Sequence, residues 1–158
     1  MSSADSRSHL PPMVSFVAPS GTGKTTLVEQ VIGGLIAEGV KVGAIKHDAH
    51  RIELDTEGKD SWRMRQAGAD TLLVGKNQLA WMSDEAETPP LEALVELFYA
   101  DTDVIIVEGW RSAGLPTVLV ERPEVVDDRW YRPDDSRIIA TVHPSDVADA
   151  IAAVRTLL

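Results

Sequence analysis

Apolar and polar positions alternate along the chain in two patterns, which predict strands and helices in turn. Short apolar runs predict strands at 13–17, 40–45, 71–74, 79–82, 103–108, 117–120 and 137–142. Apolar residues at helical spacing predict helices at 24–38, 59–66, 89–100 and 147–158. Strands that alternate with helices predict an α/β fold, a mostly parallel twisted sheet flanked by helices. The short connection 75–78 predicts a small antiparallel hairpin, which would interrupt an all-parallel sheet.

A glycine-bearing turn separates the first predicted strand from the helix that begins at Lys24. Such a turn points several backbone N–H groups at one place, where the positive end of the helix dipole also lies, and this arrangement favours phosphate binding. The alternative is an ordinary loop, because an isolated glycine-rich turn often occurs by chance. Lys24 can reach the β- and γ-phosphates of a nucleotide, and the Thr25 hydroxyl can hold a bridging Mg²⁺. With Ala18 at the first glycine position, the stretch predicts a P-loop NTPase-like fold. The predicted phosphate-binding residues are Pro19, Ser20, Gly21, Thr22, Gly23, Lys24, Thr25 and Thr26.

A second strong signal is the run 103–108, in which four consecutive apolar residues stand between two acids. Such a run is typical of a strand that is buried on both faces of a parallel sheet. Because parallel strands present their C-terminal ends to the ligand, Glu108 is expected near the P-loop, and Asp103 at the opposite edge, capping the start of the strand. Glu108 is therefore predicted to be a Walker B-type catalytic acid and, with Thr25, a metal ligand. The alternative is a charged residue that merely leaves the sheet.

The polar segment 47–60 begins where the second predicted strand ends, at the edge where open α/β sheets bind ligands. Asp55 and Asp60 are further catalytic candidates, because a carboxylate in this segment can orient an attacking water or the outer shell of a metal. Lys59 is placed to touch phosphate from the same helix start. The alternative is that Asp60 only favours the helix dipole and that the other acids are solvated.

Composition limits the possible functions. A length of 158 residues suits one domain, expected at 13–158 after a disordered polar tail at 1–12. A net charge of −10 argues against nucleic acid as a partner, because that binding depends on clusters of Lys and Arg. The absence of cysteine excludes disulfides and thiolate metal sites. No apolar run is long enough to span a bilayer, so a soluble, cytoplasmic protein is expected.

Four motifs together resemble one family in their order and spacing. They are Ser20-Gly21-Thr22-Gly23-Lys24-Thr25-Thr26-Leu27, then Ile45-Lys46-His47 with His50, then Asp55-Thr56-Glu57-Gly58-Lys59-Asp60-Ser61 with Arg63 and Ala67-Gly68-Ala69, then Val107-Glu108-Gly109-Trp110. This series resembles the MobB family, the molybdopterin-guanine dinucleotide biosynthesis adapter proteins, over nearly the whole chain from Met13. Two positions depart from the family pattern: Glu57 stands where the family usually has Pro, and Trp110-Arg111 where it often has an aromatic residue plus lysine.

The resemblance implies a GTP-binding protein with weak Mg²⁺-dependent hydrolysis, a homodimer, and a partner of the guanylyltransferase that attaches GMP to molybdopterin. Under this interpretation Lys46, His47 and His50 could bind an anionic pterin phosphate, while a solvated loop or a zinc pair are the alternatives for the histidines. Guanine preference is not evident from the residues, because Gly75-Lys76-Asn77 is not the Asn-Lys-x-Asp element of many GTPases. The turn 143–146 is a candidate for recognising the base.

The competing hypothesis is a P-loop kinase that phosphorylates a small metabolite. Such kinases usually close an arginine-bearing lid over the transferred phosphoryl group. The segment 121–137, with Arg122, Arg129 and Arg132, is the candidate for a lid, although prolines and acids crowd it.

Overall fold

The computed structural model describes residues 10–48, 52, 54–84, 87–125 and 135–158. Its contacts divide the chain into two compact units, one formed by Met1–Asp48 with Leu91–Leu158 and the other by Ala49–Pro90. We call them the first and the second unit and describe each by itself. The prediction of a single domain over 13–158 stays a prediction, because a compact unit defined by contacts is not by itself an independently folding domain.

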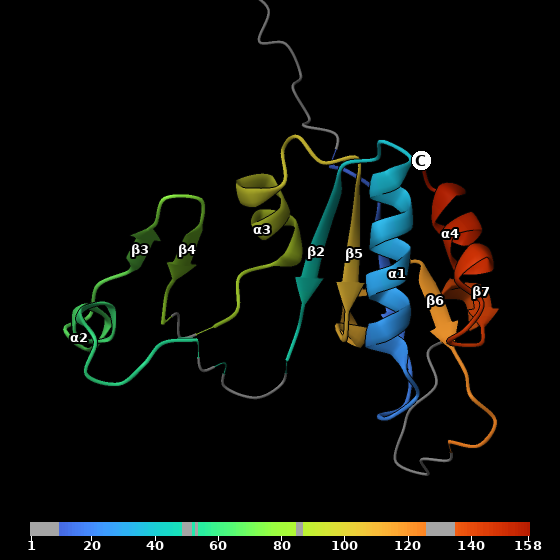
Figure 1. Cartoon of the computed structure of the whole chain (residues 1–158), viewed down its shortest axis with the longest axis horizontal. Helices are drawn as coiled ribbons and strands as arrows, with labels where there is room; N and C mark the ends of the chain where they lie inside the picture. The colour runs from blue at the N-terminus through green and yellow to red at the C-terminus, as the bar shows by residue number, and fades with distance from the viewer. Residues whose placement is uncertain (1–9, 49–51, 53, 85–86, 126–134) are drawn as a thin grey trace, which may run out of the picture. The chain divides into compact units, whose positions relative to one another are not determined.

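The first unit contains a five-stranded sheet in which every neighbouring pair of strands is parallel (Figure 1). The strands lie in the order β2-β5-β1-β6-β7. Their bounds are β1 Met13–Val17, β2 Val42–Lys46, β5 Val104–Glu108, β6 Thr117–Val120 and β7 Ile138–Val142. The predicted α/β fold with a mostly parallel sheet is confirmed.

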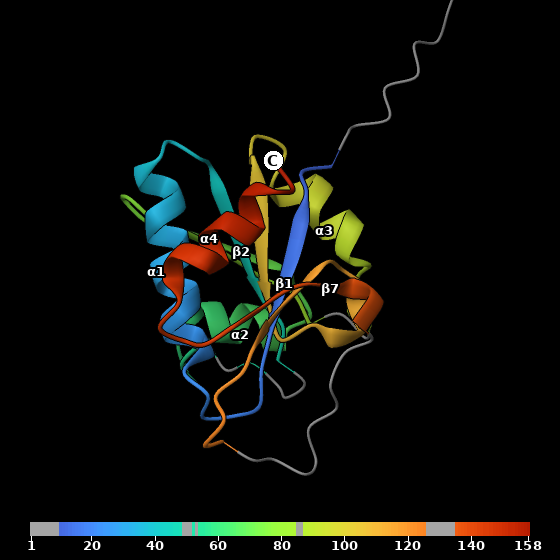
Figure 2. The ribbon, with the colours of Figure 1, turned by 90° about the vertical axis from the view of Figure 1, so that its right-hand side faces the viewer.

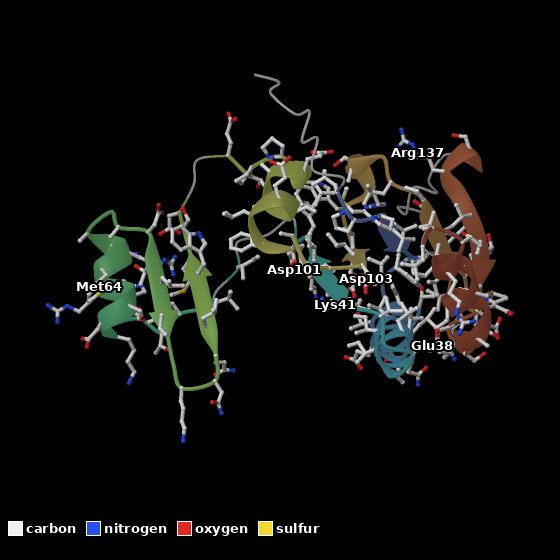
Figure 3. The ribbon with its side chains drawn as sticks, turned by 90° about the horizontal axis from the view of Figure 1, so that it is seen from above. Glu38, Lys41, Met64, Asp101, Asp103 and Arg137 are labelled. Carbon is white, nitrogen blue, oxygen red and sulfur yellow. The ribbon has the colours of Figure 1, made fainter. Side chains whose placement is uncertain are left out.

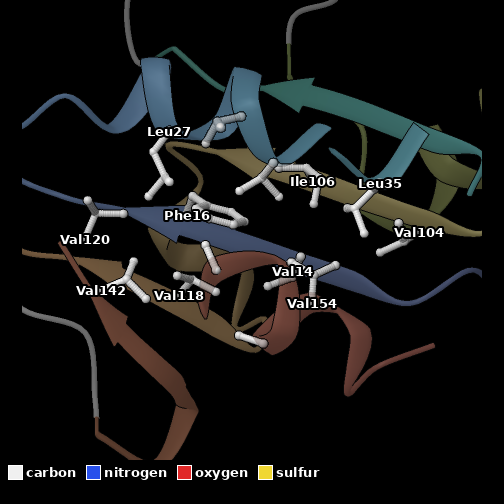
Figure 4. Close-up of a cluster of buried hydrophobic side chains, with 14 residues drawn as sticks. Val14, Phe16, Leu27, Leu35, Val104, Ile106, Val118, Val120, Val142 and Val154 are labelled. Atoms are coloured by element: carbon white, nitrogen blue, oxygen red, sulfur yellow. The ribbon is translucent and has the colours of Figure 1, made fainter. Parts of the chain in front are cut away.

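Helices cover both faces of this sheet. Figure 2 shows α1 (Lys24–Ala37) and α4 (Val147–Arg155) on one side of the sheet and α3 (Leu91–Phe98) on the other. Side chains of β5 alternate between the faces: Val104 and Ile106 join the cluster under α1 and α4 (Figure 4), while Ile105 and Val107 pack with α3. Burying each of these aliphatic side chains contributes about 1.5–3 kcal/mol. Burial on both faces is therefore what makes this run wholly apolar.

The parallel arrangement puts Asp103 and Glu108, the acids on either side of the apolar run 104–107, at opposite ends of the strands, as the sequence predicts. Glu108 ends β5, at the edge where β1 runs into the P-loop. Asp103 precedes β5, and its Oδ2 accepts a hydrogen bond of 2.8 Å from the backbone N–H of Lys41, just before β2 (Figure 3). Asp103 therefore ties the start of one strand to the start of its neighbour, and it takes no part in the edge that carries Glu108.

Gly109 is required where β5 leaves the sheet. Its φ of 93° lies in the left-handed region, which costs a residue with a Cβ about 1–2 kcal/mol. A Cβ at this position would also lie only 2.6 Å from the carbonyl oxygen of His47. The close approach arises because the His47 backbone N–H donates a 2.9 Å hydrogen bond to the Glu108 carbonyl, which extends the β2–β5 pairing past Lys46. Glycine here lets the two strand ends stay paired beside the site.

The second unit contains α2 (Asp60–Gln66) and an antiparallel hairpin of β3 (Thr71–Val74) and β4 (Leu79–Met82). Both strand bounds agree with the prediction. The expectation that this hairpin would interrupt the parallel sheet is wrong, because β3 and β4 form a two-stranded sheet of their own. Two short apolar runs joined by a short connection predict that β3 pairs with β4. They do not predict whether this pair joins the parallel sheet.

Some helices and strands are shorter or shifted relative to the predictions, because the residues next to them form turns. The strand predicted at 40–45 spans Val42–Lys46, because Gly39 and Val40 close α1. The N–H of Gly39 bonds to the Ile36 carbonyl and that of Val40 to the Leu35 carbonyl, the paired hydrogen bonds of a Schellman motif. Similarly, α4 ends at Arg155 because tighter turns follow it.

Near the start of the chain, Leu10 packs against the cluster beneath α3, and the Pro12 carbonyl accepts a 2.9 Å hydrogen bond from the Ile105 N–H. Residues 1–9 lie outside the described part, so the tail predicted there stays a prediction. Across the described ranges, no helix combines the length and apolarity needed to cross a membrane.

Candidate functional site

The loop between β1 and α1 has the backbone shape that the sequence predicts for a phosphate cradle. Gly21 and Gly23 have φ angles of 76° and 93°, which turn the chain so that the helix can begin at Lys24. The Thr22 hydroxyl donates a 2.7 Å hydrogen bond to the Pro19 carbonyl and closes the turn. No side chain caps the start of α1 and no acid stands in its first turn. Its initial N–H groups, which have no acceptor within the helix, are therefore available to an anion, and the helix's own first turn has no carboxylate to compete for them.

This loop surrounds a cavity of about 310 Å³. The cavity is lined by Ala18, Pro19, Ser20, Gly21, Thr22, Gly23, Lys24, Thr25, Thr26 and Glu108. The structure thus brings together the eight P-loop residues predicted to bind phosphate and the acid predicted to hold the metal. They come from segments more than eighty positions apart in the chain, joined by the pairing of β1 with β5.

Glu108 contacts both functional side chains of the P-loop. Its Oε1 lies 2.5 Å from Lys24 Nζ and accepts a 3.1 Å hydrogen bond from the Thr25 hydroxyl. The side chains of Lys24 and Glu108 are 17% and 13% exposed, so most of the pair is shielded from water. One carboxylate oxygen therefore contacts both the lysine and the threonine that the sequence predicts to bind phosphate and metal.

Electrostatics keep Glu108 ionised. Its burial acts to raise the pKa, but the hydrogen bond and charge of Lys24, the hydrogen bond of Thr25 and the charge of Lys46 outweigh burial and lower the pKa below its ordinary value. A lowered pKa in the folded state means that the pair contributes to stability above the ordinary glutamate range. That contribution is lost as the pH falls through the lowered pKa. At neutral pH the carboxylate is thus available as a metal ligand.

The end of β2 adds Lys46 and His47 beside Glu108, and Trp110 follows two residues after β5. Lys46 is the strand partner of Glu108, and its charge acts on that carboxylate. The ring of the next residue, His47, stacks on Trp110, with ring centroids 4.6 Å apart and an interplanar angle of 25°. The sequence motifs predict a site role for Lys46 and His47 but not for Trp110. The signal for Trp110 was its position two residues beyond Glu108, on the same turn. His50 lies outside the described residues.

Asp55, Lys59 and Asp60 belong to the second unit. Asp55 is largely committed to contacts there: its Oδ1 accepts 2.9 Å hydrogen bonds from the Thr56 N–H and the Ser61 hydroxyl, and its Oδ2 lies 3.6 Å from Arg65 Nη1. The side chain of Asp55 is only 7% exposed. Lys59 occupies the N-cap position of α2, and Asp60 is an exposed residue in its first turn. Their roles in catalysis or phosphate binding stay predictions.

Comparison with known proteins gives a consistent result. The family model for MobB, molybdopterin guanine dinucleotide synthesis protein B, matches residues 13–144. The molybdopterin-guanine dinucleotide biosynthesis adapter protein of Haemophilus influenzae is 33% identical over 86% of this chain and 78% of its own length. The protein of the same name from Escherichia coli K12 is 38% identical over 78% of this chain and 71% of its own length.

Solved structures show the same fold. The crystal structure of Bacillus subtilis MobB has a TM-score of 0.66 and 25% identity, and covers 93% of this chain and 98% of its own. A crystal structure of molybdopterin-guanine biosynthesis protein B also has a TM-score of 0.66, with 24% identity, and covers 94% of this chain and all of its own. The P-loop cavity, the strand order and these matches agree: the chain belongs to the MobB family.

Proposed function

We propose that this protein is an adapter in molybdopterin-guanine dinucleotide biosynthesis that binds GTP with Mg²⁺ at its P-loop and hydrolyses it slowly. The adapter role is supported by the names of the relatives that match most of the chain. Triphosphate binding is supported by one observation above the others: Lys24, Thr25 and Glu108 meet in the cavity lined by the P-loop.

Each group of the cavity has a part in this proposal. Backbone N–H groups of the loop and the start of α1 hold the phosphates, and Lys24 contacts the β- and γ-phosphates. Thr25 and Glu108 supply protein oxygens to Mg²⁺, which characteristically takes one or two such ligands and completes its shell with phosphate oxygens and waters. Lys24 and Glu108 form an ion pair in this structure. Binding of GTP with Mg²⁺ would therefore require the pair to separate, with Lys24 turning toward phosphate and Glu108 toward the metal.

We propose that the residues at the end of β2 take part in recognising the partner. Lys46 and His47, with His50, are proposed to meet the anionic phosphate of molybdopterin, or a surface of the guanylyltransferase that carries it. Lys46 adds positive charge next to Glu108, and the stack on Trp110 restrains the imidazole of His47. Asp55, Lys59 and Asp60 are proposed to act from the second unit on the attacking water or on phosphate. For Asp55 this requires giving up hydrogen bonds to Thr56 or Ser61.

The kinase hypothesis has less support. Arg122 of the proposed lid is described and lies 3.5 Å from Glu124, whereas Arg129 and Arg132 lie outside the described residues. The family match and the relatives' names favour the adapter. Incubation with labelled ATP or GTP and small-molecule acceptors separates the two hypotheses, because fast stoichiometric phosphoryl transfer to any acceptor would contradict the adapter role.

Replacing Lys24 tests the triphosphate site. Lys24→Ala is expected to weaken GTP binding at least about a hundredfold, since a charge-assisted contact to phosphate is lost in a shielded cavity. Titration calorimetry with GTP and Mg²⁺ measures the change. Lys41→Ala is the matched control, because Lys41 is an exposed lysine at the other edge of the sheet. Equal affinities for the two variants would contradict the proposal.

Replacing Glu108 tests the metal site. Glu108→Gln is expected to slow Mg²⁺-dependent hydrolysis at least about tenfold while changing GTP affinity much less, since the phosphate contacts survive. In EDTA the same variant is expected to bind GTP more tightly than the unaltered protein, because Lys24 is released from its ion pair. Asp103→Asn is the control at the other end of β5, where it affects only the contact to Lys41. Greater damage from the control would show that the metal acid has been assigned to the wrong end of the strand.

Replacing Asp60 separates a catalytic from a helix-terminal role. Asp60→Asn is expected to slow GTP turnover well beyond its effect on stability, where loss of the helix-dipole interaction costs about 0.3–1 kcal/mol. Asp149→Asn removes an equivalent exposed acid from the first turn of α4 and controls for that cost. Turnover and thermal unfolding are measured on both variants. Full turnover in Asp60→Asn would leave Asp60 with a structural role only.

The hairpin of the second unit supports the proposed homodimer. Apolar side chains are exposed along both of its strands, including the cross-strand pair Val74 and Leu79 at 76% and 72%. A two-stranded sheet that leaves such side chains in water is marginal alone, and a second copy that covers them removes this cost.

Replacing Leu79 tests that interface. The unaltered protein is expected to sediment as a dimer and Leu79→Lys as a monomer, because the introduced charge cannot be buried against an apolar partner. Leu97→Lys on α3 is the matched control, since Leu97 is 70% exposed in the first unit. A monomeric unaltered protein, or dissociation by the control alone, would contradict this interface.

A further inference from the structure

The histidine that follows β2 is contacted by three consecutive residues at the end of β5. The His47 N–H donates a 2.9 Å hydrogen bond to the Glu108 carbonyl, and a Cβ on Gly109 would lie 2.6 Å from the His47 carbonyl oxygen. The third residue, Trp110, stacks its ring on the imidazole, with the ring centroids 4.6 Å apart. The segment 108–110 therefore restrains both the backbone and the ring of His47.

Trp110 is itself anchored in the first unit. Its half-buried side chain packs against the cluster beneath α3, which contains Val95 and Ile105. Its carbonyl accepts a 3.2 Å hydrogen bond from the Ala113 N–H, which closes the short turn that follows. Among the described strands, β2 pairs only with β5, so its end is supported from one side of the sheet plane alone. The stack on Trp110 adds a second support, from the core side.

The stacked pair and Glu108 lie on opposite faces of the sheet. Along β5, Ile106 joins the cluster under α1 and α4, so Glu108, two residues later, falls on that face. Along β2, Ile45 packs with the cluster beneath α3, so His47 falls on the other face, where Trp110 also packs. Figure 2 shows α1 and α3 on these two sides of the sheet. Neither His47 nor Trp110 is among the described residues that line the P-loop cavity.

Stacking leaves the hydrogen-bonding edge of the His47 ring available. The stack occupies a flat face of the imidazole, whereas both ring nitrogens lie in the plane of the ring and bond along its edge. Within the described ranges, neither nitrogen has a hydrogen-bond partner. A ring that is restrained before a ligand arrives loses less conformational entropy on binding. An oriented imidazole with a free edge is therefore suited to bind an anionic oxygen.

We infer that Trp110 is a positioning residue, which holds the His47 imidazole on the α3 face so that its edge meets the phosphate of molybdopterin, and that neither residue contacts GTP. The inference rests on the partner recognition proposed above and deepens it, because it names the residue that orients His47. The alternative is that the indole only covers the cluster beneath α3, in which case another apolar side chain would serve as well.

Guanylation of molybdopterin by the guanylyltransferase in the presence of the full chain tests this role. Trp110→Leu is expected to raise the apparent KM for molybdopterin at least about threefold with kcat within about twofold, because leucine covers the cluster but offers no flat face to the imidazole. Trp110→Phe keeps an aromatic face and is expected to restore the KM to within about twofold. Titration calorimetry is expected to find GTP affinity within about twofold of the unaltered protein in both variants.

The outcomes separate this inference from the proposed function. An unchanged KM in Trp110→Leu, or an equal loss of GTP affinity, would overturn the inference and leave the adapter proposal intact. An unchanged KM with a higher half-saturating concentration of the adapter would place His47 against the guanylyltransferase, and this too would overturn the inference. No stimulation of guanylation by the unaltered chain would contradict the proposed function itself, and the inference with it.

A double-mutant cycle shows whether Trp110 acts through His47. His47→Ala is expected to raise the KM at least as much as Trp110→Leu, and the double variant no further than His47→Ala alone. Additive effects would overturn the positioning role. Tyr99→Leu is the matched control, because Tyr99 packs on the same cluster but does not stack on His47. An equal rise in KM for this control would assign the effect to the cluster and overturn the inference.

Discussion

The site depends on the position of one carboxylate. Glu108 Oε1 is shared by Lys24 and Thr25, so three side chains from two distant segments are held around one point before any ligand binds. This contact exists only because β5 lies between β1 and β2, with all three strands parallel and their C-terminal ends at one edge. The ion pair keeps the acid ionised and holds the two side chains together, and it also sets the cost that Mg²⁺ and phosphate would have to offset on binding.

Gly109 and Trp110, which follow Glu108 directly, help to keep the end of β5 in place. Gly109 allows β5 to turn away while the His47 carbonyl approaches closely, and Trp110 returns to stack on the His47 ring. The apolar residues of β5 fill both faces of the sheet, so the strand has little freedom to shift relative to its neighbours. A rigid strand end is suited to presenting a metal ligand, because errors of about an ångström at such a site are costly.

The two compact units differ in how they are stabilised. The first has buried clusters on both faces of its sheet, whereas the hairpin of the second leaves large apolar side chains in water. Asp55, Ser61 and Arg65 link the start of α2 to the body of that helix through polar contacts. In an acid-rich segment that looked catalytic in the sequence, Asp55 therefore has a local structural use.

The sequence by itself determined the elements whose signals are local: β1, the P-loop, α1 with its closing Gly39, and both strands of the hairpin. It also determined which acid of β5 lies near the P-loop, because the parallel-strand rule needs only chain direction. Tertiary structure alone decided that the hairpin stays outside the parallel sheet, that Asp55 accepts a hydrogen bond from Ser61, and that Arg122 and His143 line one cavity beside the P-loop. These outcomes depend on which distant segments pack together. The local spacing of residues along the chain does not indicate which of the possible packing partners is the most stable.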